Sequence, residues 1–176
     1  TGEVMAIGRT FEESLLKAID SLDIKLNYQL GLKLFNNCSV EQLLEYIKTP
    51  TDERIFAICK ALQKGVSVEK IVDITKIDYF FIKKLEKIVL LADELMDTNI
   101  DSLTYDQLRS AKMTGFSDSY IANLLGTSVD KVMEKRNQFD IHPVYKMVDT
   151  CAAEFEAVTP YYYSTYERKD DSIRSN

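Results

Sequence analysis

The stretch GVSVEKIVDITKIDYFFI (residues 65–82) recurs, with different letters but the same chemical order, as GFSDSYIANLLGTSVDKV (residues 115–132). The two align without a gap at an offset of fifty residues, so that Gly65 matches Gly115 and Ser67 matches Ser117. In each copy, a glycine that can end one helix is followed closely by a serine that can cap the next. The repeat therefore predicts a three-helix module that occurs twice, over residues 51–88 and 102–139.

Signals for two further helices precede the first copy. Residues 10–13 (TFEE) and 39–42 (SVEQ) are capping boxes, in which the first and fourth side chains each bind the other residue's backbone amide. They predict helices over residues 11–22 and from residue 40 to Pro50, because proline disfavours helix in the residue before it. Thr51 is then expected to cap a helix over residues 52–64. Between residues 23 and 37, leucines repeat every four residues but also alternate, and we interpret the segment as helical.

The helix after Asp78 is predicted to be longer than its counterpart in the second copy. Its apolar period continues to Asp97, so it could join the two modules. After Ile141 the helical period fades, and the β-favouring run at residues 161–163 (YYY) indicates an extended tail that lies along a partner surface. The predicted fold class is all-α: a multi-helix bundle with two repeated helix-turn-helix-like trihelical modules and an extended C-terminal tail.

Composition limits the classes of partner. Of the 176 residues, 45% are hydrophobic and 28% charged, with few glycines and prolines, which is typical of a helical globular protein. A net charge of −6 argues against nucleic-acid and anionic-membrane surfaces, since these require clustered Lys and Arg. No apolar run approaches the roughly 18 residues of a membrane span, and no signal peptide is visible. Three dispersed cysteines fit reduced thiols in the cytoplasm, and a first residue other than Met fits an excised fragment.

The second copy of the module resembles a helix-turn-helix, so a DNA-binding regulator is the alternative function. Its candidate recognition helix carries Asp130 and Glu134 beside two lysines and an arginine, and a protein that binds phosphates usually shows more positive charge. A structural module is therefore the favoured interpretation.

Catalytic chemistry has two weak candidates. His142 is the only histidine, and it lacks a second ligand at metal-binding spacing. Cys151 could be a nucleophile, but His142 and Lys146 are its only nearby bases. The sequence also lacks a phosphate-binding glycine loop. No catalytic, cofactor-binding or metal-binding residue is therefore predicted.

Two apolar groups are candidates for contact with other surfaces. The ambiguous segment is denser in apolar residues than a solvated surface usually is, and we expect self-association there, through Leu30, Leu32, Leu34 and Phe35. Tyrosine buries a large amphipathic area at low entropic cost, which suits an interdomain groove. We expect four residues to dock in this way: Tyr161, Tyr162, Tyr163 and Tyr166.

Several strings together resemble the central part of the carbamoyl phosphate synthetase large chain. They are GEVMAIGRT (2–10), PTDERI (50–55), TKID (75–78), HPVYK (142–146), VDTCAAEF (148–155) and YSTYE (163–167). Each is weak alone, but their order and spacing are specific, and they span nearly the whole chain. The resemblance implies that residues 1–9 leave a first ATP-grasp half and that residues 10–150 are the helical oligomerisation domain. Residues 151–176 would then form an extended tail and linker to the second half.

The function that the resemblance implies is organisational: a non-catalytic domain that connects the flanking ATP-grasp halves and forms a homo-oligomer. The parent enzyme would use ATP, with Mg or Mn, and bicarbonate, together with ammonia released from glutamine by a small amidotransferase subunit. Its carbamoyl phosphate would supply arginine and pyrimidine synthesis. Because the family's metal- and nucleotide-binding residues lie in the two halves, none is carried onto this sequence.

Overall fold

Helices form most of the part of the chain that the structure describes. The computed structural model describes residues 3–22, 30, 34–148 and 161–167. In chain order the elements are α1 (Phe11–Ser21), α2 (Val40–Tyr46), α3 (Arg54–Gln63), α4 (Val68–Thr75), α5 (Tyr79–Met96), α6 (Tyr105–Thr114), α7 (Asp118–Leu124), α8 (Val129–Gln138), β1 (Val144–Met147) and β2 (Tyr162–Thr165). The predicted all-α class is confirmed, with a small two-stranded sheet in addition.

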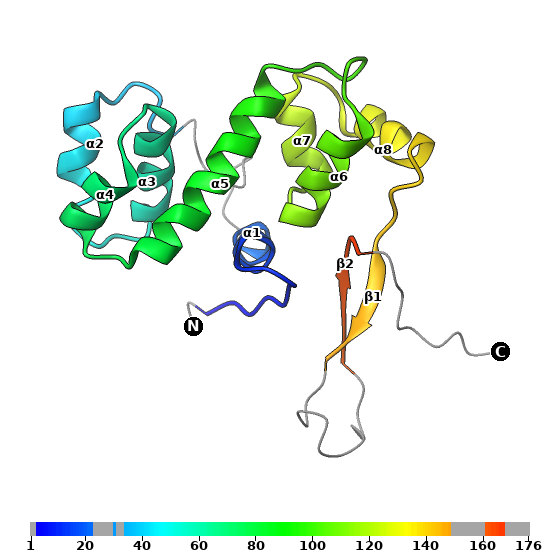
Figure 1. Cartoon of the computed structure of the whole chain (residues 1–176), viewed down its shortest axis with the longest axis horizontal. Helices are drawn as coiled ribbons and strands as arrows, with labels where there is room; N and C mark the ends of the chain where they lie inside the picture. Colours follow the sequence, from blue (N-terminus) through cyan, green and yellow to red (C-terminus); the bar gives the residue numbers. More distant parts are fainter. Residues whose placement is uncertain (1–2, 23–29, 31–33, 149–160, 168–176) are drawn as a thin grey trace.

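Helix α5 joins the two modules. Helices α2, α3 and α4 gather at one of its ends and α6, α7 and α8 at the other, while α1 lies beneath its middle (Figure 1). The helix packs against α1, α3, α4, α6 and α7. It buries residues along its length: Ile82, Leu85, Ile88, Val89, Ala92 and Leu95. Because these residues contribute to one hydrophobic cluster with both modules, α5 ties the modules into one core.

The two modules share local geometry as well as sequence. Gly65 and Gly115 both have positive φ, the left-handed conformation in which glycine ends a helix. The next residue in each copy donates the same backbone hydrogen bond, from Val66 N to Ala61 O and from Phe116 N to Ala111 O, at 3.0 Å in both cases. Ser67 and Ser117, fifty residues apart, then cap α4 and α7 through their side chains. The predicted duplication is confirmed.

Three helix predictions need correction. The helix expected to run to Pro50 ends at Tyr46, and residues 47 and 48 form a turn. The helix expected from residue 52 begins at Arg54, its N-cap is Glu53, and no side chain caps it. Residues 51–53 form a turn instead, closed by a hydrogen bond of 3.2 Å from Arg54 N to the carbonyl of Thr51. Residues 34–37 are turns, so the helix predicted between 23 and 37 does not continue to its expected end. Most of that segment lies outside the described residues.

The tail strand pairs with the chain itself. Strands β1 and β2 are antiparallel, with Val144 opposite Thr165 and Met147 opposite Tyr162, and the pair projects from the helices beyond α8 (Figure 1). The extended conformation of the tail was predicted, but its pairing partner was not. The pairing joins residues from both sides of the boundary expected at residue 150. Among the described helices, none is both long and apolar enough to cross a bilayer.

Candidate functional site

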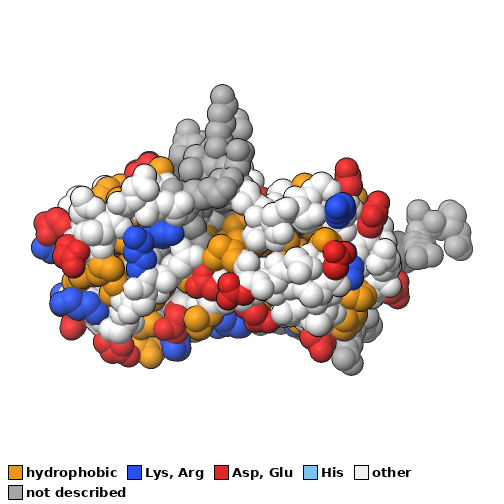
Figure 2. Space-filling model, turned by 90° about the horizontal axis from the view of Figure 1, so that it is seen from above, with side chains coloured by type: hydrophobic (Ala, Val, Ile, Leu, Met, Phe, Trp, Pro, Cys, Tyr) orange, Lys and Arg blue, Asp and Glu red, His pale blue; other side chains and the backbone are white. Residues whose placement is uncertain are grey.

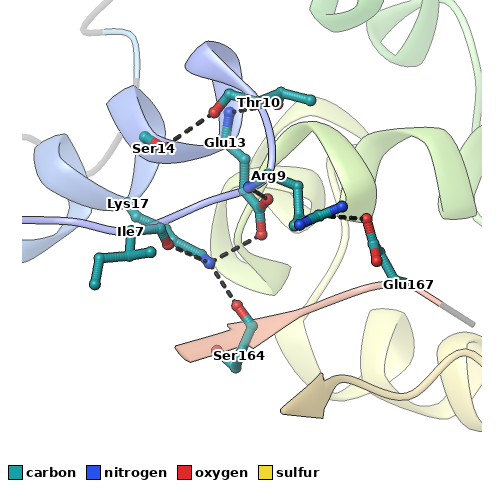
Figure 3. A network of polar contacts seen from close by, with 8 residues as sticks. All are labelled: Ile7, Arg9, Thr10, Glu13, Ser14, Lys17, Ser164 and Glu167. Carbon is teal, nitrogen blue, oxygen red and sulfur yellow. Dashed lines mark hydrogen bonds and ion pairs between the residues drawn. The ribbon is translucent and has the colours of Figure 1, made fainter. Parts of the chain in front are cut away.

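The leading segment (residues 3–10) and the tail strand β2 meet on helix α1. Lys17 Nζ donates hydrogen bonds to Ile7 O at 3.0 Å and to Ser164 O at 2.5 Å, and it forms an ion pair of 2.9 Å with Glu13 (Figure 3). A second link joins Arg9 Nε to Glu167 Oε1 at 2.8 Å. We call Arg9, Glu13, Lys17, Ser164 and Glu167 the junction network. Through it, α1 contacts both the leading segment and the tail strand.

The N-terminus of α1 orients this network. Thr10 caps the helix, because its hydroxyl accepts a hydrogen bond of 3.2 Å from Glu13 N. The Glu13 carboxylate does not bind the amide of Thr10, as the predicted capping box requires, but accepts from Arg9 N at 2.7 Å. Glu13 is buried, so it needs the paired cation of Lys17. Because Glu13 is buried, the Glu13–Lys17 pair is expected to contribute more to stability than the Arg9–Glu167 pair, which is more exposed to solvent.

A buried lysine lies against Tyr166, the residue that follows the tail strand. The side chain of Lys112 is 5% exposed, and its Nζ donates to Phe116 O at 2.7 Å and to Asp118 Oδ1 at 2.8 Å. Arg136 binds the second oxygen of Asp118 at 3.3 Å, and Lys112 Nζ lies 4.9 Å from the centre of the Tyr166 ring. Burial lowers the pKa of Lys112, although the hydrogen bond to Asp118 acts to raise it. We call Lys112, Asp118, Arg136 and Tyr166 the Lys112 cluster.

The candidate self-association residues are divided by the fold. Leu30 is fully buried, and Phe35 is buried against Tyr46 with ring centres 5.1 Å apart, so the core accounts for both. Leu34 is 46% exposed and is available to a partner. Leu32 lies outside the described residues. A contact between copies through this group stays a prediction.

The four tyrosines also differ in environment. Tyr161 and Tyr162 are exposed. The ring of Tyr163 lies 5.7 Å from Lys17 Nζ, and the ring of Tyr166 lies 4.9 Å from Lys112 Nζ. Two of the four are therefore placed against the helices of this chain. Docking of Tyr161 and Tyr162 in an interdomain groove stays a prediction.

Sequence reasoning did not find the junction network, and of the Lys112 cluster it named only Tyr166 as a contact residue. A lysine in the last turn of a helix, such as Lys112, is usually explained by the helix dipole, and nothing in its neighbours indicates burial. Of the two catalytic candidates, Cys151 lies outside the described residues. His142 is paired with Asp140 at 3.2 Å, and the described ranges contain no group of three potential metal ligands.

Residues 3–140 match the family described as carbamoyl-phosphate synthetase large chain, oligomerisation domain. This chain belongs to that family. It is 50% identical, over 169 residues, to the carbamoyl phosphate synthase large chain of Methanothrix thermoacetophila. The aligned region covers 96% of this chain and 15% of that protein. Proteins of the same name from Methanosarcina mazei (50% over 167 residues, 95% of this chain) and Methanosarcina barkeri (49% over 176 residues, 100%) are similar. The chain spans about 15% of the length of these curated relatives.

Membership of the carbamoyl-phosphate synthetase oligomerisation-domain family gives no support to the DNA-binding alternative. On the face seen from above, acidic side chains lie between the basic ones, without a continuous basic stripe in that view (Figure 2). Binding of phosphates needs clustered positive charge. The helix-turn-helix likeness of α6–α8 therefore receives no support from charge on this face.

Proposed function

We propose that this oligomerisation domain is also a connector, which holds two catalytic halves of the parent large chain in a fixed relation. The observation that supports the connecting role is the junction network, because α1 binds both the leading segment and β2. The proposed boundaries are residues 1–9 for the exit from the first ATP-grasp half, 10–150 for the helical domain and 151–176 for the tail and linker. The Lys112 cluster adds a second attachment of the tail.

In this proposal the domain itself performs no catalysis. The two buried carboxylates in the first turn of α1 have structural partners: Glu13 binds Lys17 and the Arg9 amide, and Glu12 binds Lys84 and Lys87. The ATP, with Mg or Mn, would be bound by the flanking halves. The parent enzyme would use bicarbonate and ammonia, supplied from glutamine by a small amidotransferase subunit, to make carbamoyl phosphate for arginine and pyrimidine synthesis in the cytoplasm.

Light scattering over a range of concentrations tests self-association of this chain. A mass above the 20.2 kDa of one copy is expected, and a single-copy mass at every concentration would refute self-association by this domain. Leu34→Glu places a charge on the exposed candidate contact and is expected to lower the mass. The matched control is Val129→Glu, which alters an exposed apolar residue on α8. If both variants keep the wild-type mass, Leu34 lies outside the contact.

A further inference from the structure

One face of α5 exposes aromatic and aliphatic side chains that the core does not use. Tyr79, Phe80 and Leu90 are each about half exposed or more, with Leu90 at 60%. With Lys83 and Lys87 they line a hollow of about 660 Å³, and we call these five residues the α5 face. An apolar patch rimmed by charged groups is typical of a surface that another polypeptide covers.

A second hollow adjoins this face and contains an unsatisfied acceptor. It has a volume of about 340 Å³, lies between α1, α5 and α6, and is lined by Glu12, Lys87, Arg109 and Met113 among others. The Glu12 side chain is 1% exposed; its Oε1 pairs with Lys84 at 3.3 Å and Lys87 at 3.1 Å, but its Oε2 has no hydrogen-bond partner among the described residues. A buried carboxylate oxygen without a donor is costly, so this cleft fits a partner that supplies an N–H or O–H group.

The two hollows are continuous with the leading segment. Lys87 lines both of them. Phe11, the first residue after the leading segment, packs its ring against Phe80 at 6.2 Å and Phe81 at 5.2 Å between centres. The leading segment itself exposes apolar side chains, with Met5 at 87%. In Figure 1 this segment and α1 lie on the same side of α5. Whatever polypeptide leads into residue 3 therefore arrives beside this surface.

We propose that the α5 face and the Glu12 cleft together dock the catalytic half that leads into the leading segment of the parent chain. The docked surface would place an apolar side chain against Tyr79 and Leu90 and a hydrogen-bond donor near Glu12. A covalently attached neighbour is favoured over a second copy, because a short connection gives it a high effective concentration at this site. This inference rests on the proposed function, in which a catalytic half precedes the helical domain.

Photo-cross-linking in the full-length large chain tests the docking. A benzophenone amino acid replaces Leu90 or Met113, one in each hollow, and the linked peptides are identified by mass spectrometry. Links within one chain, to peptides that precede this segment, are expected, with a yield unchanged on roughly tenfold dilution because the reaction is unimolecular. Met96 and Met133 are exposed but line neither hollow. When the probe replaces either of them, the yield of links to the preceding peptides is expected to be clearly lower than from Leu90 or Met113.

Two results would overturn the docking proposal. One is a link between two chains that grows with concentration, which would assign the surface to a second copy. The other is the absence of links above the Met96 and Met133 controls. Neither result bears on the mass of the isolated chain measured by light scattering, so failure of the docking and failure of self-association are distinguishable.

Discussion

The Lys112 ammonium lies in a part of the molecule where a charge must be fully compensated. It binds one carbonyl and one carboxylate, and the Tyr166 ring covers it. Removing one member of a buried ion pair leaves the other without its partner, although Arg136 still binds Asp118 here. The residue therefore affects both the stability of the second module and the attachment of the tail.

Lys112→Met tests this role. It keeps the apolar stem but removes the donor to the Phe116 carbonyl and to Asp118, so the free energy of unfolding is expected to fall by about 3 kcal/mol. The control is Lys131→Met on α8, an exposed lysine, for which a change within about 0.5 kcal/mol is expected. Urea unfolding followed by circular dichroism measures both. Equal losses in the two variants would show that the buried contacts of Lys112 do not contribute.

Because the thiol of Cys59 is buried, the free energy of unfolding is expected to fall at alkaline pH. Burial raises the pKa of its thiol to about 12, whereas the thiol of the unfolded chain ionises near its ordinary value of 9.0. Below the unfolded pKa both states hold the proton, so stability is complete. As pH rises from about 9 toward 12, only the unfolded state loses the proton, and folding weakens by up to about 1.4 kcal/mol per pH unit.

Cys59→Ala removes this contribution while leaving other alkaline groups, such as the buried Tyr120, in place. The expected result is a smaller decrease in the free energy of unfolding between pH 9 and 11 in the variant than in the wild type. Urea titrations at several pH values measure the difference. Parallel pH profiles for the two proteins would contradict the assignment.

At the scale of elements, helix starts were predictable because their signals are local. Ser67, Asp78 and Ser117 cap α4, α5 and α7 as expected, since each cap bonds to an amide two or three residues away. The same signal at Thr104 and Gln107 forms a full capping box that was not among the predicted caps. The strand pair could not be predicted in this way, because β1 and β2 are short and the two strands that pair are separated along the sequence.

Packing between elements separates two glycines that look equivalent in sequence. A Cβ at Gly65 would meet nothing within 4 Å, whereas a Cβ at Gly115 would lie 2.9 Å from the Cα of Glu13 in α1. Gly65→Ala is expected to cost roughly 1 kcal/mol, from the left-handed backbone alone. Gly115→Ala is expected to cost about 1–3 kcal/mol more, because the backbone of α1 must move. Thermal unfolding of both variants measures the difference, and equal costs would exclude close contact between α1 and the second module.

At the scale of the whole molecule, the family and the duplicated modules could be predicted, but the surfaces could not. Apolar density predicted an interface at residues 30–35, yet Leu30 and Phe35 are buried in the core. Conversely, the three consecutive aromatic residues that begin α5 do not by themselves indicate which face of the helix is buried, and Tyr79, Phe80 and Phe81 are all exposed. Which apolar residues face outward depends on how α1 and both modules surround α5, and a single sequence does not contain that arrangement.

The central claim is that α1 keeps the leading segment and the tail strand in a fixed relation. Its most direct test is the distance distribution between spin labels at Met5 and Tyr161, both exposed, measured by double electron–electron resonance with the native cysteines replaced by alanine. A single narrow distribution is predicted, which broadens in Lys17→Met because the bonds to Ile7 and Ser164 are lost, and stays narrow in the control Lys48→Met. A broad distribution with Lys17 intact would contradict the account.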